Sequence, residues 1–451
     1  MSEDHAVDVR TLINTHQITP FQWMVVFFCF LVVALVGFEL AIMGYIAPEF
    51  KLQWQVTDHS LGPVLSAAMV GLTVGALFAG PLADKFGRRL ILVVTVLLFG
   101  LFTLVCATAD NLTHMVAYRF ITGLGLGGAM PNAAALVSEF SPEKRRSIIV
   151  TFVFAGFTFG AAGSGFLSAL LIPLWGWRSV LLCGGVLSIL MSLALLLKLP
   201  ESIRFLMAKD TPAAMIRQSI RQLAPDLVLR EKTSFYFSRT MTGEGDTIKS
   251  DTGGINLVLS ARYRFGSFMF WITFFMGCAL VYLFSSWMPT LVKESGYTVS
   301  RAAVVAAFFQ IAGPVGSLFI GWCMDRTGPE KVLACSYVVG GIFLLGFSMA
   351  AHHFSSLLVV SFIVGFCFNG ANAGMTALTT LFYPTSARAT GASWMHGIGH
   401  LGAILSTFAG AEMLAMNWSF AQIIDSLTLP ALLAALAVAA IGHRQLIENP
   451  A

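Results

Sequence analysis

Two charged side chains lie inside long apolar segments of the sequence, where ionised groups are rare. Glu39 lies in the segment 22–48, and Arg119 lies near the start of the segment 114–138. A charge at the centre of a lipid bilayer costs about 3 kcal/mol or more unless it is paired or hydrated, so both residues are candidates for function. A carboxyl group whose contact with an arginine changes between two states can bind and release a proton. We therefore predict that Glu39 and Arg119 couple a proton, with a static ion pair between two helices as the alternative.

Arg119 also has the geometry to bind a substrate. Its planar guanidinium group can hold a carboxylate through two parallel hydrogen bonds. His400 is a second candidate because it lies near the middle of an apolar segment, where a protonated imidazole can bind a carboxylate. His396 lies one helical turn away, and packing is its expected role. The two histidines could bind zinc, but no acidic residue lies between them and no third ligand is near, so we predict no metal site.

Uncharged polar and aromatic side chains in the apolar segments offer further ligand contacts. An asparagine there can bind a ligand, although a hydrogen bond to a neighbouring helix explains it equally well. An aromatic ring can stack on a cyclic ligand, although most aromatic residues of such a chain face lipid or other helices. The candidates are Asn132, Asn372, Phe38, Tyr282, Trp287 and Trp394.

Membrane-spanning helices must position these residues. Hydrophobic residues make up 57% of the 451 residues and charged residues 11%, whereas soluble domains carry about 25% charged residues. The mean hydropathy of +0.79 and the small net charge of +4 exclude a soluble globular protein and a nucleic-acid-binding protein. Twelve stretches have the roughly 20 apolar residues that cross a bilayer. They cover residues 22–48, 61–83, 90–108, 114–138, 148–173, 179–199, 266–290, 302–323, 332–351, 355–382, 389–415 and 424–442.

The basic residues between these stretches predict that both termini are cytoplasmic. If twelve spans begin inside, the short inside loops and tails hold eleven Lys and Arg residues, and the outside loops hold four. One long polar interval separates the sixth span from the seventh, and it is predicted to be a cytoplasmic linker that is partly helical over 211–223. The predicted regions are a tail at 1–21, a six-helix bundle at 22–200, the linker at 201–265, a second bundle at 266–442 and a tail at 443–451.

Two loop motifs recur at nearly the same offset in the two predicted bundles. The loop around Asp84 is partly repeated around Asp325 (325 − 84 = 241). The pattern Pro-x-x-x-Arg ending at Arg146 returns at Arg388 (388 − 146 = 242). Because two unrelated motifs share the offset, we predict an internal duplication. The fold class is therefore predicted to be an all-α membrane protein with twelve transmembrane helices in two pseudo-symmetric six-helix bundles.

The first of these loops carries residues with distinct structural roles. Gly80 permits close contact between helices, and Gly87 permits a tight turn. Asp84 is predicted to accept hydrogen bonds at the end of a neighbouring helix, while Arg88 and Arg89 hold the turn in the cytosol.

The two loops, together with Arg119-x-x-x-Gly123, resemble the major facilitator superfamily over nearly the whole chain. The resemblance implies two six-helix bundles around a central cavity that opens alternately to each side of the membrane. It also implies that the loop residues and their neighbours control this opening. The predicted gating residues are Gly80, Asp84, Gly87, Arg88, Arg89, Glu139, Arg146, Asp325, Arg326 and Arg388.

A narrower resemblance is to the aromatic acid:proton symporters. The motifs that carry it are Gly37-Phe38-Glu39, Gly125-x-Gly127-Gly128-x-x-Pro131-Asn132, Leu199-Pro200-Glu201-Ser202, Ser286-Trp287-Met288-Pro289 and Tyr383-Pro384-Thr385-x-x-Arg388-Ala389-Thr390-Gly391. The resemblance implies an importer of aromatic or related organic carboxylates in the bacterial inner membrane. It implies the proton as coupling ion, no other cofactor, contact with lipid, and function as a monomer.

The chain departs from that family where the family places charge. The family usually has Asp-Gly-x-Asp in the first span, where this chain has Val36 and Glu39. It also tends to carry an arginine at the position of His400. Losing an acid in one half and a fixed cation in the other would keep the charge balance if the two normally neutralise each other.

Other functions have less support in the sequence. A proton-coupled drug or metabolite exporter of the same superfamily usually shows a Gly-Pro pair in the fifth span, and here Gly160 precedes Ala161. A transport-inactive membrane sensor usually gains a sizeable soluble extension, and the 201–265 interval is short and plain. An enzyme is not expected, because no nucleophile, metal or nucleotide motif is present.

Overall fold

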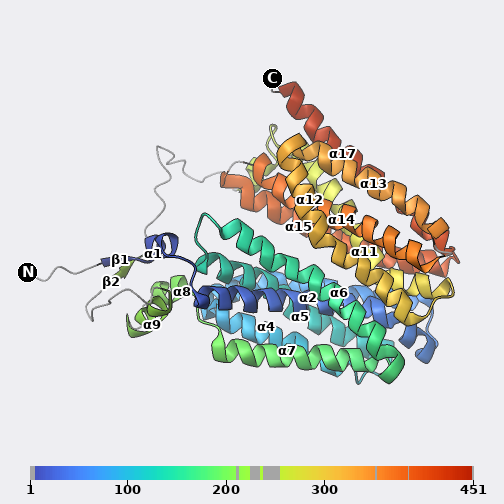
Figure 1. Cartoon of the computed structure of the whole chain (residues 1–451), viewed down its shortest axis with the longest axis horizontal. Coiled ribbons are helices and arrows are strands. Elements are labelled where there is room, and N and C mark those ends of the chain that lie inside the picture. Colours follow the sequence, from blue (N-terminus) through green and yellow to red (C-terminus); the bar gives the residue numbers. More distant parts are fainter. Residues whose placement is uncertain are drawn as a thin grey trace, which may run out of the picture.

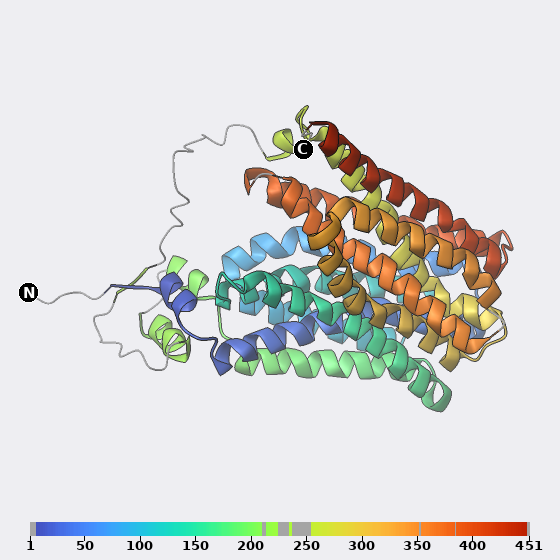
Figure 2. The same cartoon turned by 45° about the horizontal axis from the view of Figure 1, so that its top comes forward.

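Long helices account for most of the chain. The computed structural model describes residues 6–209, 213–223, 234–236, 254–350, 353–383 and 385–448. Twelve of the described segments are long and apolar enough to cross a membrane, which confirms the spans predicted from hydropathy. Figures 1 and 2 show them as two adjacent groups, one from each half of the sequence.

The first group, called the N-half below, contains the first six spans. Its α2 packs on α6, α3 packs on α5, and α4 contacts both α5 and α7. The start of α2 is encoded locally, because Thr19 and Gln22 form a capping box and Pro20 occupies the first turn. The helices are α2 (Pro20–Trp54), α3 (Asp58–Phe86), α4 (Arg88–Cys106), α5 (Leu112–Phe140), α6 (Arg146–Trp175) and α7 (Arg178–Lys198).

The second group, called the C-half, repeats these contacts. Its α11 packs on α15, α12 on α14, and α13 contacts α14 and α17. The last span, predicted as one stretch, is interrupted between α16 and α17. The helices are α11 (Arg264–Glu294), α12 (Val299–Thr327), α13 (Pro329–Ala350), α14 (Phe354–Phe382), α15 (Thr385–Ala415), α16 (Phe420–Ser426) and α17 (Thr428–Glu448).

The backbone confirms the internal duplication. Gly87 ends α3 with a φ of 99°, and Gly328 ends α12 with a φ of 97°, at an offset of 241 residues (328 − 87). Gln55 and Gly296, which follow α2 and α11, also have positive φ at that offset (296 − 55 = 241). Glycine adopts such angles without strain, which explains why Gly87 and Gly328 close the two matching turns.

Short elements gather at one end of the N-half, called the linker end below; the opposite end, where α2 turns into α3, is called the far end (Figures 1 and 2). They are β1 (Ala6–Asp8), α1 (Val9–Thr15), α8 (Ile203–Ala208), α9 (Ala213–Leu223) and β2 (Ser234–Tyr236). The parallel pairing of β1 with β2 is a small departure from the all-helical prediction. The helix predicted over 211–223 is α9, while the Gly/Ser/Thr-rich run at 240–253 and Pro384 lie outside the described residues. A further helix, α10 (Gly254–Val258), precedes α11 and contacts α15.

Two apolar cores hold the helices together. One core lies in the N-half and continues onto the linker-end helices through Leu12 of α1 and Ile220 of α9. The other core crosses from one half to the other, and includes Ile46 of α2, Leu291 of α11 and Ala411 of α15. The halves meet where α2 contacts α11, α3 contacts α15, and α6 contacts α12. The far end is therefore continuous between the halves.

Candidate functional site

Glu39 and Arg119 form a pair in the interior of the N-half, as their depth in the sequence predicts. Their side chains are 0% and 1% exposed, and Arg119 Nη1 lies 3.5 Å from Glu39 Oε2. Arg119 Nη2 donates a hydrogen bond of 2.7 Å to the backbone carbonyl of Glu39. The arginine is thus anchored by a neutral acceptor and lies close to, but not in tight contact with, the carboxylate.

Two further helices position the carboxyl group of Glu39. Thr103 of α4 donates a hydrogen bond of 2.7 Å from its hydroxyl to Glu39 Oε2. Gly184 of α7 leaves room for the side chains of Glu39 and Phe38, since a Cβ there would lie 3.2 Å from Glu39 Oε1 and 2.6 Å from Phe38 Cε1. Glu39 Oε1 and Arg119 Nε have no hydrogen-bond partner among the described residues. The site therefore has unused capacity for a proton or a polar partner.

The burial of the pair bears on the predicted substrate role of Arg119. Both side chains lie among α2, α4, α5 and α7 of one half, and neither is open to solvent in this conformation. A carboxylate ligand could reach the guanidinium only after the helices move. The structure therefore supports the expected contact between Glu39 and Arg119, while a direct ligand contact of Arg119 stays a prediction.

The C-half has a polar interior of a different kind. Tyr337 of α13 donates a hydrogen bond of 2.9 Å to Asn372 Oδ1 of α14. One turn further along α14, Thr376 Oγ1 lies 3.4 Å from His396 Nε2 of α15. His400 follows on α15, is half-buried, and its Nδ1 has no hydrogen-bond partner among the described residues. We call Tyr337, Asn372, Thr376, His396 and His400 the C-half cluster.

Two of the predicted ligand residues belong to this cluster, and their contact with a ligand stays a prediction. Asn372 and His400 are half-buried and lie on adjoining helices. His396 packs its ring 4.8 Å from the ring of Phe274 and places Nδ1 2.8 Å from the carbonyl of Ala392, which fits the packing role expected for it.

The remaining predicted ligand residues have varied surroundings. Trp287 is 0% exposed and donates from Nε1 to the carbonyl of Thr407, so it joins α11 to α15 and cannot stack on a ligand in this conformation. Trp394 is 47% exposed and stacks on Trp271 with ring centroids 5.8 Å apart.

Three others lie within the helix bundles. Asn132 is buried, and its amide donates 2.7 Å to the carbonyl of Gly128 one turn earlier. Phe38 is buried against α7, and Tyr282 is half-buried on α11. Of the four aromatic candidates, Tyr282 and Trp394 are therefore the two that retain exposed ring surface.

The first predicted gating loop is held by an acid that the sequence analysis did not assign. Glu201 Oε1 accepts hydrogen bonds from the backbone N–H groups of Arg88 and Arg89, at 3.0 and 3.1 Å, and so caps α4. The prediction that Asp84 makes such a cap is wrong in this conformation, because its side chain is exposed and accepts no hydrogen bond from the described residues. An acid directly after a span, facing a basic loop, is the signal that could have identified Glu201.

Two other predicted gating residues of the first loop, Arg88 and Gly80, have different surroundings. Arg88 Nη1 lies 2.8 Å from Glu139 Oε1, which brings two predicted gating residues together, and Ser202 also donates to Glu139. The predicted close helix contact at Gly80 is wrong for this conformation, since a Cβ there would meet no atom within 4 Å. The physical reason is that Gly80 lies on an exposed side of α3.

The second loop is more open than the first. Asp325, Arg326 and Arg388 are exposed, and the guanidinium of Arg326 lies 4.0 Å from the ring centroid of Trp322. Arg146 is also exposed and lines a pocket beside Glu139 at the linker end.

At the far end, each half contributes one lysine and one acid to a crossed arrangement. Lys51 Nζ lies 2.8 Å from Glu294 Oε1, and Lys293 Nζ lies 2.7 Å from Glu49 Oε1. Both pairs join α2 to α11, and therefore hold the two halves together at this end. Sequence reasoning missed these pairs, because it counts the two lysines only among the basic residues of the outside loops and gives the two glutamates no role.

Comparison with known proteins identifies the family. A profile described as the Major Facilitator Superfamily matches residues 29–407 and 270–444. The chain is 43% identical over 432 residues to the 4-hydroxybenzoate transporter PcaK of Pseudomonas aeruginosa, covering 96% of this chain and 95% of that protein. It is 40% identical over 448 residues to the gallate transporter of Pseudomonas putida, covering 99% and 98%.

Solved structures share the fold. A bacterial homologue of the human lysosomal transporter Spinster, in an inward-facing conformation, matches with a TM-score of 0.71 at 15% identity, covering 96% of this chain and 99% of that one. A D-xylose–proton symporter matches with a TM-score of 0.69 at 16% identity, covering 92% and 97%. The twelve spans, the duplicated halves and these similarities together place the chain in the major facilitator superfamily, among its aromatic acid transporters.

Proposed function

We propose that this protein imports an aromatic carboxylate together with protons across the inner membrane of a bacterium. The linker end would face the cytoplasm, because the basic residues of the predicted inside loops gather there. The names of the relatives, which carry 4-hydroxybenzoate and gallate, support an aromatic carboxylate as substrate. The proton is the coupling ion and no further cofactor takes part; one copy of the chain suffices.

The Glu39–Arg119 pair is the observation that carries the proton step. The hydrogen bond from Arg119 ends on the backbone carbonyl of Glu39, so it does not depend on the charge of the carboxyl group. Thr103 holds Oε2 through a hydroxyl, which can donate to a carboxylate and can also accept from a carboxylic acid. The carboxyl group can therefore change its charge inside a scaffold that stays assembled, which a reversible proton carrier requires.

The charges explain why substrate and proton would move together. With Glu39 ionised, the pair is neutral, and with Glu39 protonated, the buried guanidinium is left as a net positive charge. A buried unpaired charge is unfavourable, so an anionic substrate that approaches it offsets the penalty. Protonation and carboxylate binding therefore favour each other, and one proton per carboxylate is the smallest stoichiometry that restores neutrality.

The structure corresponds to a carrier closed at the far end. The crossed lysine–glutamate pairs and a contact of 2.9 Å between His59 Nε2 and Glu412 Oε1 join the halves there. Uptake requires these contacts to separate, so that the far end opens to the outside and then closes behind the substrate.

Uptake into proteoliposomes tests the proposal. Labelled 4-hydroxybenzoate, protocatechuate, benzoate and muconate would be offered with and without an inward proton gradient. We expect gradient-driven accumulation of at least one acid by the wild type, and its loss in Glu39→Gln, with exchange of internal for external substrate retained. Asp110→Asn, an exposed acid on the loop before α5, is the matched control. Accumulation by Glu39→Gln at the wild-type level would place the proton step elsewhere, and no uptake of any acid would overturn the substrate class.

A further inference from the structure

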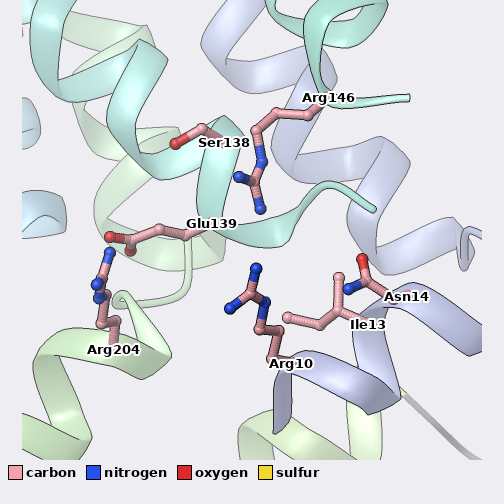
Figure 3. Close-up of a pocket in the computed structure, with 7 residues that line it drawn as sticks. All are labelled: Arg10, Ile13, Asn14, Ser138, Glu139, Arg146 and Arg204. Atoms are coloured by element: carbon pink, nitrogen blue, oxygen red, sulfur yellow. The ribbon is translucent and has the colours of Figure 1, made fainter. Parts of the chain in front are cut away.

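A small basic pocket lies at the linker end, apart from the Glu39–Arg119 pair. Its volume is about 80 Å³. It is formed where α1, the end of α5, the start of α6 and α8 come together (Figure 3). Its lining residues are Arg10, Ile13, Asn14, Ser138, Glu139, Arg146 and Arg204.

The positive charges of the pocket exceed its negative charges. Three arginines line it, against the single carboxylate of Glu139. That carboxylate is already engaged outside the pocket, by Arg88 Nη1 at 2.8 Å and by the hydroxyl of Ser202. Arg10 is paired with Glu143, which lies 2.7 Å from its Nε. Arg204 faces the same Glu139 carboxylate, which Arg88 already pairs (Figure 3). Arg146 forms no ion pair with a described residue, so the arginines around the pocket still outnumber the carboxylates that they face.

The side chains converge on one space. Figure 3 shows the guanidinium groups of Arg10 and Arg146 extending toward each other from opposite sides of the pocket, while the carboxylate of Glu139 points away from them toward Arg204. Two like charges facing each other across a small space repel unless an anion lies between them. Asn14 adds a neutral donor, since its Oδ1 accepts the backbone N–H of Glu143 at 2.9 Å, and its amide nitrogen donates to no other residue that the structure describes. Guanidinium and amide donors around a small pocket suit the oxygens of a phosphate group.

The position of the pocket favours phosphate presented by the membrane. Ile148 and Phe152, just after Arg146 on α6, are 74% and 50% exposed, and Trp23 near the start of α2 is 51% exposed. Exposed apolar side chains at the ends of spans lie against lipid, and tryptophan concentrates at the level of the headgroups. The pocket therefore lies beside the headgroup layer, where phosphodiesters are abundant.

We propose that this pocket binds a phosphate group, supplied by the headgroup of an anionic phospholipid in the leaflet that faces the linker end. The bound phosphate bridges Arg10 of α1, Arg146 of α6 and Arg204 of α8. It thereby fastens the N-terminal helix and the segment after α7 to the loop that carries the Arg88–Glu139 pair. The proposal does not depend on which substrate the protein carries, or on whether it couples protons.

Lipid binding by the purified, full-length protein tests the proposal. Delipidated protein in neutral detergent would receive phosphatidylglycerol, phosphatidylcholine or sodium phosphate, with bound lipid counted by native mass spectrometry and thermal stability measured in parallel. The site variant is Arg146→Gln with Arg204→Gln. The matched control is Arg262→Gln with Arg264→Gln, which removes two exposed arginines from the start of α11.

We expect phosphatidylglycerol to bind and stabilise the wild type and the control, and to bind the site variant at least about tenfold more weakly, because two charge-assisted contacts are lost. Stabilisation by sodium phosphate at equal or greater effect, lost in the same variant, would retain the phosphate site and replace the lipid by free phosphate. Equal binding of phosphatidylglycerol to the site variant and the control would overturn the site.

A measurement on the unaltered chain keeps the test valid if the variant does not fold. Wild-type protein would be labelled with a photoreactive phosphatidylglycerol, and the attachment sites mapped by peptide mass spectrometry. Labelling at α1 and at the start of α6, reduced by excess unlabelled phosphatidylglycerol and not by phosphatidylcholine, is the expected result. Labelling confined to other surfaces, or reduced equally by both lipids, would contradict the proposal.

Discussion

The two halves of the molecule share helix order, turn geometry and helix contacts, but differ in what they bury. The N-half encloses Glu39 and Arg119, a carboxylate and a guanidinium, both sealed from solvent. The C-half cluster contains a tyrosine, an asparagine, a threonine and two histidines, and Tyr337 and Asn372 share a hydrogen bond in it. Among its described residues, the C-half buries no Asp, Glu, Lys or Arg side chain as fully as the N-half buries this pair. Substitutions in the two halves should therefore have different consequences.

Removing the cation of the N-half pair should have the largest effect. Arg119→Gln leaves the Glu39 carboxylate buried without its counter-ion, which destabilises a protein by about 3–5 kcal/mol, and transport should be lost. Thermal unfolding in detergent and uptake into proteoliposomes measure the two effects. The double variant with Glu39→Gln should recover most of the stability without recovering transport. Destabilisation of the double variant as large as that of the single one would show that the charges do not interact.

Filling the space beside Glu39 should have the next largest effect. Gly184→Val places a Cβ 2.6 Å from Phe38 Cε1 and 3.2 Å from Glu39 Oε1, and overpacking of this kind costs about 1–3 kcal/mol. Gradient-driven accumulation should fall more than substrate exchange, because the carboxyl group is displaced. Gly163→Val is the control, since nothing lies within 4 Å of a Cβ at that position. Equal loss of activity in the two variants would mean that only helix propensity had changed.

A substitution in the C-half cluster should have a smaller effect of another kind. Tyr337→Phe removes the donor to Asn372 Oδ1, at a cost of about 1 kcal/mol. We expect a change in KM for substrate with an unaltered dependence on the proton gradient. Uptake kinetics at several gradients would separate the two quantities. If the gradient dependence changed as much as it does in Glu39→Gln, the contrast between the halves would fail.

The smallest effects should be found where the halves are alike. Lys51→Gln and Lys293→Gln each remove one of the crossed pairs at the far end. Lys51→Gln also removes a pair with Asp58 of α3, which lies within the N-half and does not join the halves. The side chains are partly exposed, so each change should cost less than about 1 kcal/mol. Both should increase labelling of a cysteine introduced at the far end, and to a similar degree. A strong effect of one lysine with none of the other would show that this end is asymmetric too.

The sequence predicts the membrane spans and the internal duplication correctly. It predicts the surroundings of individual side chains less accurately. Hydropathy locates a residue along the membrane normal, which is enough to predict that Glu39 and Arg119 lie at similar depth. It does not give the direction of a side chain around the helix axis, because helices buried on several sides have little contrast between their faces. Trp287 was therefore a reasonable ligand candidate, although the structure buries it between α11 and α15.

Loop chemistry was predicted only where backbone geometry dictates it. The turn at Gly87 follows from glycine's tolerance of positive φ, and the structure confirms it. The cap on α4 comes instead from Glu201, 112 residues after Arg89 in the chain (201 − 89 = 112). Such a contact depends on the packing of α7 against α4, and local sequence does not report it.

The crossed lysine–glutamate pairs make the contact between the two halves depend on the salt concentration of the surrounding medium. Their side chains are 22–43% exposed, so dissolved ions reach them. Electrostatic screening acts over about 8 Å at physiological ionic strength and about 30 Å in a hundredth-molar medium. With the far end facing outward, as proposed above, a cell in dilute fresh water would keep this end closed more firmly than a cell in brine. Habitat salinity alone would shift how often the empty carrier opens outward, with no change in the protein.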